Sequence, residues 1–465
     1  MSTPTRTEKD SLGTFQVPAD ALYGVQTARA LANFPISGRR PDPDFVAATV
    51  RVKRAAAAAN HACGSLDDRR ADAIREACDQ VLGGAYTDQF VVDRFQAGAG
   101  TSHNMNANEV LANLANLGLG GECGVYDPVH PNDHVNQSQS TNDTIPTAIR
   151  LAALAKLPRL AEAVREMAGA LEAFADRERE TIKSGRTHLQ DAVPTTLGRE
   201  LAAYAWTLRE QVERLEEAAK SLHRIGLGGT AAGTGLNAPP GYRERAAEEL
   251  SRLMGRPITP HPDMAAAMQS MADLAQFSGQ IAALAGELTR ISNDIRLLSS
   301  GPRTGLAEVQ LPAVQPGSSI MPGKVNPVMF EMLNQTLYQV LGQDHAIQAM
   351  NRAGQMELNV MMPALGSALF DAMEWLTASV SAATERGVRG MTANRERNRE
   401  YALASVGLAT LLNRAIGYEK AAEVAKESER TGIPVGELVA EHGLLSREQF
   451  ERMVEEAAKN GRVDF

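Results

Sequence analysis

Four short segments carry most of the side chains in this sequence that could bind or transform a small molecule. Each holds several Ser, Thr, Asn or His residues, which favour turns and helix caps over helix interiors. The segments span residues 98–109, 134–146, 184–194 and 315–327. Taken singly, each could be a loop whose hydroxyl groups cap the next helix. Together they combine many neutral hydrogen-bond donors with few cations (Arg186, Lys324), which suits the binding of a small dianion such as a dicarboxylate.

The last segment reads QPGSSIMPGKVNP and is unusual in its backbone chemistry. Its three prolines fix φ, and its two glycines allow backbone angles that other residues avoid. A loop of this kind can hold backbone N–H groups in a concave arrangement, where a serine such as Ser318 would lose its proton more easily than a free serine. Such loops are often lids over active sites. The alternative is a rigid connector between two helices.

Other motifs with recognised chemistry are incomplete. The glycine-rich run at residues 226–235 follows a predicted helix and lacks the GxGxxG spacing of a dinucleotide site. Gly323 and Lys324 are followed by valine, where a phosphate-binding P-loop needs Ser or Thr. The stretch HPNDH at residues 130–134 has no accompanying HExxH motif or cysteine set. We therefore expect neither a nucleotide loop nor a catalytic metal.

Composition narrows the class of protein. A chain of 465 residues with 43% hydrophobic residues can form two or three domains with a large core. The formal net charge of -9 argues against a nucleic-acid partner. The sequence has no apolar run of about 18 residues and no secretory signal, so no membrane association is expected. Its three cysteines are widely spaced, which fits a reduced, cytoplasmic protein.

Helical periodicity dominates the middle of the chain, where apolar residues recur every three or four positions. The predicted helices cover residues 157–174, 197–215, 264–298, 328–350 and 360–388. Pro158 should lie near the start of the first helix or kink it. The helix over residues 264–298 would be about 50 Å long. Helices of this length pack as a bundle, and we expect them to cross between the subunits of an oligomer.

Changes in composition predict three domains. Residues 1–141 would form a mixed, mostly helical N-terminal domain. Residues 142–396 would form the central domain of long helices, including the last polar segment. Residues 397–465 are more charged and would form a small helical C-terminal domain.

The stretch GSSIMPGKVNP resembles the signature of the fumarase–aspartase superfamily, and its GKVNP ending resembles the class II fumarase and aspartase branch. The resemblance extends over nearly the whole chain, from YGVQT to GIPVGELVAEHGLLSREQF. It implies a mainly all-α, three-domain fold and a homotetramer whose long helices form a central twenty-helix core. It also implies active sites that each draw on three subunits, and no cofactor.

The reaction that the resemblance implies is an anti elimination from a succinyl-type substrate to give fumarate. Ser318 would be the general base that removes the Cβ proton, and the adjacent carboxylate would take up the charge as an aci-carboxylate. The positions that match carboxylate-binding residues are Thr101, Ser140, Thr141 and Ser319 for that carboxylate and Thr187, Lys324 and Asn326 for the other. Asn142 and the second catalytic residue, His188, would lie near the leaving group.

The remaining question is which group the substrate loses, ammonia or water. The segments that resemble aspartase are GAGTS, NMNANEV, the threonine of SQSTND, RTHLQDAVP and NPVMFEMLNQ, whereas VHPNDHVN and GGTA resemble fumarase. The segments around the reacting centre favour elimination of ammonia from L-aspartate, with elimination of water from L-malate as the alternative. A binding protein that has lost catalysis is a further alternative, but it should have lost Ser318, Lys324, Asn326 or His188, and all four are present.

Overall fold

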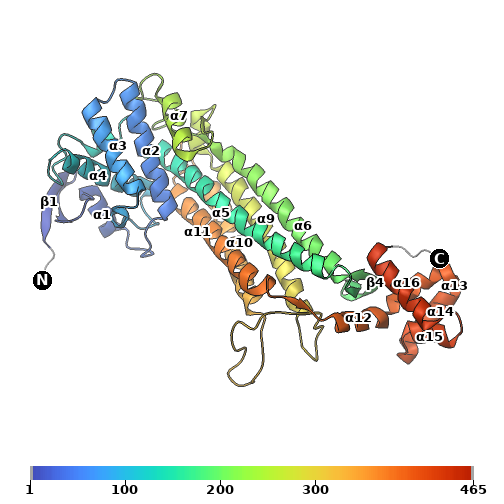
Figure 1. The fold of residues 1–465 in the computed structure, drawn as a ribbon. Helices are drawn as coiled ribbons and strands as arrows, with labels where there is room; N and C mark the ends of the chain where they lie inside the picture. The colour runs from blue at the N-terminus through green and yellow to red at the C-terminus, as the bar shows by residue number, and fades with distance from the viewer. Residues whose placement is uncertain (1–3, 462–465) are drawn as a thin grey trace. The chain divides into compact units, whose positions relative to one another are not determined.

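Helices make up most of the computed structural model, which describes residues 4–461 (Figure 1). The strands are short and form only two-stranded sheets within this range. The predicted mainly all-α fold is confirmed. No helix within residues 4–461 is long and apolar enough to cross a membrane.

The N-terminal part begins with an antiparallel hairpin of β1 (Thr5–Asp10) and β2 (Gly13–Pro18). The helices that follow are α1 (Val25–Asn33), α2 (Pro43–Ala62), α3 (Asp68–Leu82) and α4 (Thr101–Gly118), with short turns η1 (Thr87–Gln89), η2 (Gly98–Gly100) and the π-helix η3 (Pro131–Val135). Asp42 caps α2 by accepting from two backbone N–H groups, and a proline occupies the first turn, where it fits a helix start.

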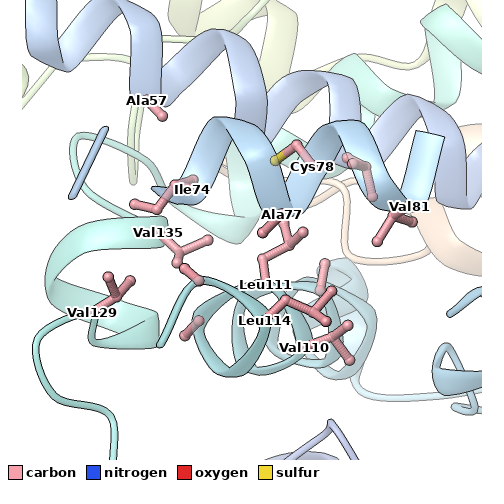
Figure 2. Packing of buried hydrophobic residues seen from close by; sticks show 14 of the residues in the cluster. Ala57, Ile74, Ala77, Cys78, Val81, Val110, Leu111, Leu114, Val129 and Val135 are labelled. Atoms are coloured by element: carbon pink, nitrogen blue, oxygen red, sulfur yellow. The ribbon is translucent and has the colours of Figure 1, made fainter. Parts of the chain in front are cut away.

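A compact apolar core holds α4 against α3 and η3. Figure 2 shows Val110, Leu111 and Leu114 of α4 facing Ile74 and other residues of α3. All of these side chains are buried. The core therefore fixes the position of α4, whose first turns carry Thr101 and Asn104.

Five long helices contain the predicted helical stripes except for the first part of the stripe over residues 264–298, and outside that part the prediction is confirmed. They are α5 (Thr141–Arg177), α6 (Leu197–Ala219), α9 (Ala272–Leu298), α10 (Val328–Asn351) and α11 (Met362–Ala383). Polar contacts join them. Arg150 of α5 makes a bidentate ion pair with Asp273 of α9, and Ser278 of α9 donates to Asp344 of α10 at 2.7 Å.

The structure corrects the expected start of the first long helix. α5 begins at Thr141 and contains both Pro146 and Pro158 in its interior. A proline inside a helix leaves the carbonyl four residues earlier without its N–H partner. For Pro158 that carbonyl belongs to Leu154, and Arg256 donates to it at 3.1 Å. This replacement hydrogen bond helps the helix to continue through the proline.

The prediction of one helix over residues 264–298 is wrong. The chain forms α8 (Met264–Gln269) and then α9, with Ser270 in an extended conformation between them. The Ser270 hydroxyl accepts from the Ala272 N–H at 3.2 Å and so caps the start of α9. The apolar spacing continues through this break, which is why periodicity alone did not reveal it.

The remaining elements are shorter. Between the long helices lie β3 (Ile182–Thr187), β4 (Gln190–Thr196), η4 (Lys220–His223), β5 (Arg224–Ile225), α7 (Tyr242–Met254), β6 (Thr259–Pro260) and β7 (Val309–Gln310). After α11 come η5 (Thr384–Val388), β8 (Thr392–Ala393), α12 (Arg395–Ala404), η6 (Val406–Leu408), α13 (Ala409–Ile416), α14 (Tyr418–Thr431), α15 (Val435–Glu441) and α16 (Arg447–Asn460). The last helices share one apolar core around Leu412, Phe450 and Val454.

The described chain forms two compact units. The first holds the chain up to Ala161, together with Arg214–Ala283 and Gln339–Trp375. The second holds Glu162–Glu213, Leu284–Tyr338 and the chain from Leu376 onward. Each of the five long helices contributes residues to both units. The three domains expected from composition remain a prediction.

Candidate active site

Ser140, Thr141 and Asn142 lie where a loop enters α5, and the buried Asp143 holds this entry in place. The Asp143 carboxylate accepts from the Ser140 N–H at 2.9 Å. Its second oxygen accepts from the N–H groups of Gly228 and Thr230 at 3.0 and 2.9 Å. Burial raises the pKa of Asp143 to about 6, so the group is still ionised and able to accept at neutral pH. One carboxylate thus joins two loops.

The side chains of this entry loop have defined roles in the hydrogen bonds. The Ser140 hydroxyl accepts from the Asn142 N–H at 3.2 Å, so its hydrogen is available to a ligand. The Asn142 Nδ2 donates to the Ala231 carbonyl at 2.8 Å. An amide fixed in this way directs its Oδ1, an acceptor, away from that carbonyl.

A buried lysine lies behind the same loop. Lys53 of α2 is fully buried and donates to Asn136 Oδ1 at 2.9 Å and Gln139 Oε1 at 3.0 Å. Asn104 of α4 donates both to that Asn136 oxygen and to Thr141 Oγ1, each at 3.2 Å. Burial lowers the pKa of Lys53 to about 7.

Thr101 is the first residue of α4 and is exposed. The two preceding residues, Ala99 and Gly100, have φ of 61° and 87°. The left-handed conformation is strained for Ala99 because it is not a glycine. The Ala99 N–H donates to the Val360 carbonyl at 2.9 Å. The strained turn therefore sets where α4 starts and where Thr101 stands.

Thr187 and His188 lie at the tip of the β3–β4 hairpin. The two turn residues, His188 and Leu189, have φ of 56° and 60°, as a type I′ turn requires. Such turns normally use Asn and Gly, so His and Leu here carry backbone strain. Leu189 is 72% exposed, so this strain is not offset by burial of its side chain in this chain. Strain of this kind is typical of functional sites.

The base of this hairpin is held by a buried carboxylate. Glu308 is fully buried and lies 2.8 Å from Lys183 Nζ and 2.7 Å from Arg186 Nη1. Lys183 also contacts Glu200. Arg186 is one of the two cations that the sequence suggested for binding a dianion, but its charge is balanced by Glu308. Lys324 is thus the stronger candidate of the two.

Ser318 lies in the loop 315–327, here called the signature loop, which contains no helix or strand. The Ser318 Oγ accepts from two backbone N–H groups, those of Ile320 at 3.2 Å and Met321 at 3.1 Å. The loop closes on itself through the Gly317 N–H, which donates to the Lys324 carbonyl at 2.9 Å. The expected convergence of N–H groups on a serine is therefore present.

The other candidates of the signature loop are held differently. The Asn326 Nδ2 donates to the Gly317 carbonyl at 2.7 Å, which fixes its side chain across the loop. Ser319 and Lys324 are exposed. The loop thus combines an internally bonded frame with two polar side chains at the surface.

The ten predicted site residues are divided between the two units. Those in the first unit are Thr101, Ser140, Thr141 and Asn142, and those in the second are Thr187, His188, Ser318, Ser319, Lys324 and Asn326. Within each unit the structure groups them on a loop, a turn or a helix start. The sequence analysis missed the supporting residues Asn104 and Asp143, although both lie inside the polar segments. It also missed Lys53 and Glu308, for which no local sequence signal exists.

Comparison with known proteins agrees with this fold. Residues 13–342 match the lyase family, and residues 408–458 match the fumarase C C-terminus family. Aspartate ammonia-lyase from a Bacillus species is 45% identical over 98% of this chain and 97% of its own length. Aspartate ammonia-lyase from Escherichia coli K12 is 44% identical over 97% of this chain and 95% of its own length.

Solved structures give the same result. A fumarate lyase:delta crystallin from Brucella melitensis, bound to cobalt, has a TM-score of 0.95 at 46% identity, covering 97% of this chain and 98% of that chain. A class II fumarase from Schistosoma mansoni has a TM-score of 0.94 at 35% identity, covering 99% of this chain and 100% of that one. The chain therefore belongs to the lyase family, within the fumarase–aspartase superfamily, and the resemblance noted in the sequence is confirmed.

Proposed function

We propose that this chain is an aspartate ammonia-lyase, a carbon–nitrogen lyase that reversibly eliminates ammonia from L-aspartate to give fumarate. The main structural support for this reaction is that two backbone N–H groups donate hydrogen bonds to the Ser318 oxygen. The relatives named aspartate ammonia-lyase, at 44% and 45% identity over nearly the whole chain, support the choice of substrate.

Ser318 is the general base in this proposal. A serine hydroxyl is normally too weak an acid to be ionised, and an alkoxide needs donors arranged before the reaction begins. The N–H groups of Ile320 and Met321 supply them at the Ser318 oxygen. The alkoxide removes the Cβ proton of L-aspartate, and the neighbouring carboxylate takes up the charge as an aci-carboxylate.

The remaining candidates bind the two carboxylates and the leaving group. For the carboxylate that becomes doubly negative we assign Thr101, Ser140, Thr141 and Ser319, and for the other one Thr187, Lys324 and Asn326. Neutral donors suit the first carboxylate, because each hydrogen bond strengthens as its charge grows. His188 and Asn142 are assigned to the leaving ammonia.

Asn142 favours an amine over a hydroxyl as the leaving group. Its Nδ2 already donates to the Ala231 carbonyl at 2.8 Å, so its Oδ1 is the atom left for a ligand. A substrate ammonium can only donate, and it therefore matches this acceptor. A hydroxyl can donate or accept, so it gains less from an amide held in one orientation.

The decisive assay mixes purified protein with L-aspartate and, separately, with L-malate, and follows fumarate by its absorbance. We expect fumarate from L-aspartate. Fumarate from L-malate alone would replace the proposal with the fumarase alternative. Ser318→Ala should lower kcat by at least about 100-fold, the usual size of a general-base contribution, while the folded state is kept. Near-normal turnover by this variant would exclude Ser318 as the base.

A homotetramer with active sites shared between subunits belongs to the same proposal. Large apolar side chains on the long helices support an oligomer, because Trp206 of α6 is 69% exposed and Tyr338 of α10 is 54% exposed in the single chain. Trp and Tyr are enriched at protein–protein interfaces relative to the rest of the surface. The cytoplasmic location also stays a prediction.

A further inference from the structure

A chain of hydrogen bonds runs from the buried amine of Lys53 to the hydroxyl of Thr141. Lys53 Nζ lies 2.9 Å from Asn136 Oδ1. The same oxygen accepts from Asn104 Nδ2 at 3.2 Å. Asn104 Nδ2 has a second acceptor, Thr141 Oγ1, also at 3.2 Å. Lys53 and Asn104 are buried and lie on helices α2 and α4, so neither is free to turn toward water.

The direction of each hydrogen bond in this chain follows from Lys53. A lysine amine facing two oxygens can only donate to them, and the second oxygen is Gln139 Oε1 at 3.0 Å. Asn136 must therefore present its oxygen to Lys53. Burial lowers the pKa of Lys53, but a neutral amine still has two N–H donors for these two acceptors. The protonated amine requires this direction because it can only donate, and the neutral amine is compatible with it.

The orientation of the Asn136 amide also determines the orientation of the Asn104 amide. Because Asn136 presents an oxygen, Asn104 must present its nitrogen there, and that nitrogen also reaches Thr141. The opposite orientation of Asn104 would place two amide oxygens together. It is therefore the Thr141 oxygen that accepts, and the hydroxyl hydrogen of Thr141 is released from this contact.

We propose that Lys53 and Asn104 are positioning residues that fix the Thr141 hydroxyl as a donor toward the substrate carboxylate. The proposal rests on the function assigned to Thr141 above and adds the reason why that hydroxyl donates. A threonine hydroxyl without such a partner can rotate and can also accept. Fixing its hydrogen before the substrate arrives removes this reorganisation from the reaction.

A purely structural role for Asn104 does not explain why its side-chain oxygen is buried without a partner. Asn104 Oδ1 is buried and has no hydrogen-bond partner among the described residues, which carries a cost in stability. An apolar residue of similar size would avoid that cost. The hydrogen bonds from its nitrogen to the Asn136 and Thr141 oxygens offset part of that cost.

The test is a double-mutant cycle in the full-length enzyme, with kcat and KM for L-aspartate as the measurement. Thr141→Val keeps the shape of the side chain and removes the hydroxyl, and Asn104→Leu removes the donor. Each should lower kcat/KM by about 10-fold to 100-fold, mostly through kcat, because the carboxylate carries most charge in the transition state. The double variant should be no worse than Thr141→Val within about 2-fold. Losses that multiply would overturn the proposal.

A matched control separates this effect from damage to α4. Asn108 is also buried on α4, and its amide donates to Met105 Sδ at 3.4 Å rather than to the chain described above. Asn108→Leu should leave kcat/KM within about 2-fold of the parent enzyme. A loss equal to that of Asn104→Leu would show that any change in this helix lowers activity, which would overturn the proposal.

If Asn104→Leu does not fold, Asn104→Asp provides a second test, because aspartate has the same shape as asparagine. Its carboxylate can only accept, so it would draw the Thr141 hydrogen away from the substrate, and we expect a loss of at least about 10-fold in kcat/KM. Unchanged activity in Asn104→Asp rejects the inference. Unchanged activity in Thr141→Val instead rejects the role given to Thr141 in the proposed function, so the two failures can be told apart.

Discussion

Asp143 shows how much of the candidate site depends on one buried acceptor. Its two oxygens receive three backbone N–H groups, one from the loop that carries Ser140 and two from residues 228 and 230. Burying a carboxylate is costly unless donors surround it, and these donors are backbone groups that cannot move away. Asp143 holds the two loops together because three backbone N–H groups donate to its one carboxylate.

Asp143→Asn tests this arrangement. An amide would place its NH2 against at least one of the backbone donors, which would then be buried without an acceptor. We expect a loss of about 2 kcal/mol in the free energy of unfolding, measured by urea denaturation, and a fall of at least about 10-fold in kcat/KM. A variant with unchanged stability and unchanged kinetics would show that the loops are held by other contacts.

At the scale of elements, the signature loop and the β3–β4 hairpin present their side chains in different ways. The hairpin places Thr187 and His188 through a strained two-residue turn on a pair of antiparallel strands whose register shifts between Ser184 and Arg186. The signature loop has no regular structure and relies on hydrogen bonds within itself, from Gly317 and Asn326. The hairpin therefore offers a stiff support, whereas the loop depends on a few contacts.

Gly317 is the sharpest test of the signature loop. A Cβ atom at this position would overlap the Lys324 carbonyl oxygen, so Gly317→Ala must separate the two sides of the loop. We expect kcat to fall by about 100-fold, because a base displaced by about 1 Å loses much of its effect. The fold should persist, since most of the loop is exposed.

Gly323→Ala is the comparison within the same loop. Gly323 has a φ of 81°, but a Cβ there would meet no described atom within 4 Å. The substitution costs only the strain of a left-handed residue, about 1 to 2 kcal/mol. Its loss in kcat should be smaller than that of Gly317→Ala, and the reverse order would contradict the role given to the Gly317 contact.

At the scale of the whole molecule, the candidate residues form two sets that lie in different compact units. If active sites are shared between subunits of a homotetramer, one set from one subunit can complete the other set from a neighbour. The oligomer would have a mass of about 199 kDa, four times the 49.8 kDa of the chain. Light scattering after size-exclusion chromatography measures this mass directly.

Subunit complementation tests the sharing itself. Thr141→Val and Ser318→Ala change one residue in each set, and each variant alone should have little activity. Co-expressed chains would form mixed tetramers in which roughly a quarter of the sites carry neither change. We expect activity well above the sum of the two parents. Activity equal to that sum would show that each site is built from one chain.

The class of fold and the segments with the candidate catalytic residues were predictable from the sequence alone. Long helices are visible because apolar spacing depends on neighbouring residues, and α6, α10 and α11 lie close to their predicted ranges. The loop around Ser318 was predictable because proline and glycine act on their own backbone. The same local reasoning failed at Ser270, where capping by one hydroxyl interrupts a periodic pattern.

Tertiary structure decided which groups face one another. Lys53, Asn104 and Thr141 are far apart in the sequence, and only the packing of α2 and α4 beside the start of α5 brings their polar atoms within hydrogen-bond distance. The balance of the Arg186 charge by Glu308 is likewise a product of packing. Periodicity and turn chemistry are local properties, whereas a hydrogen-bond partner is defined by position in space. The sequence therefore indicated the candidate donors, and the fold decided which groups of the chain they contact.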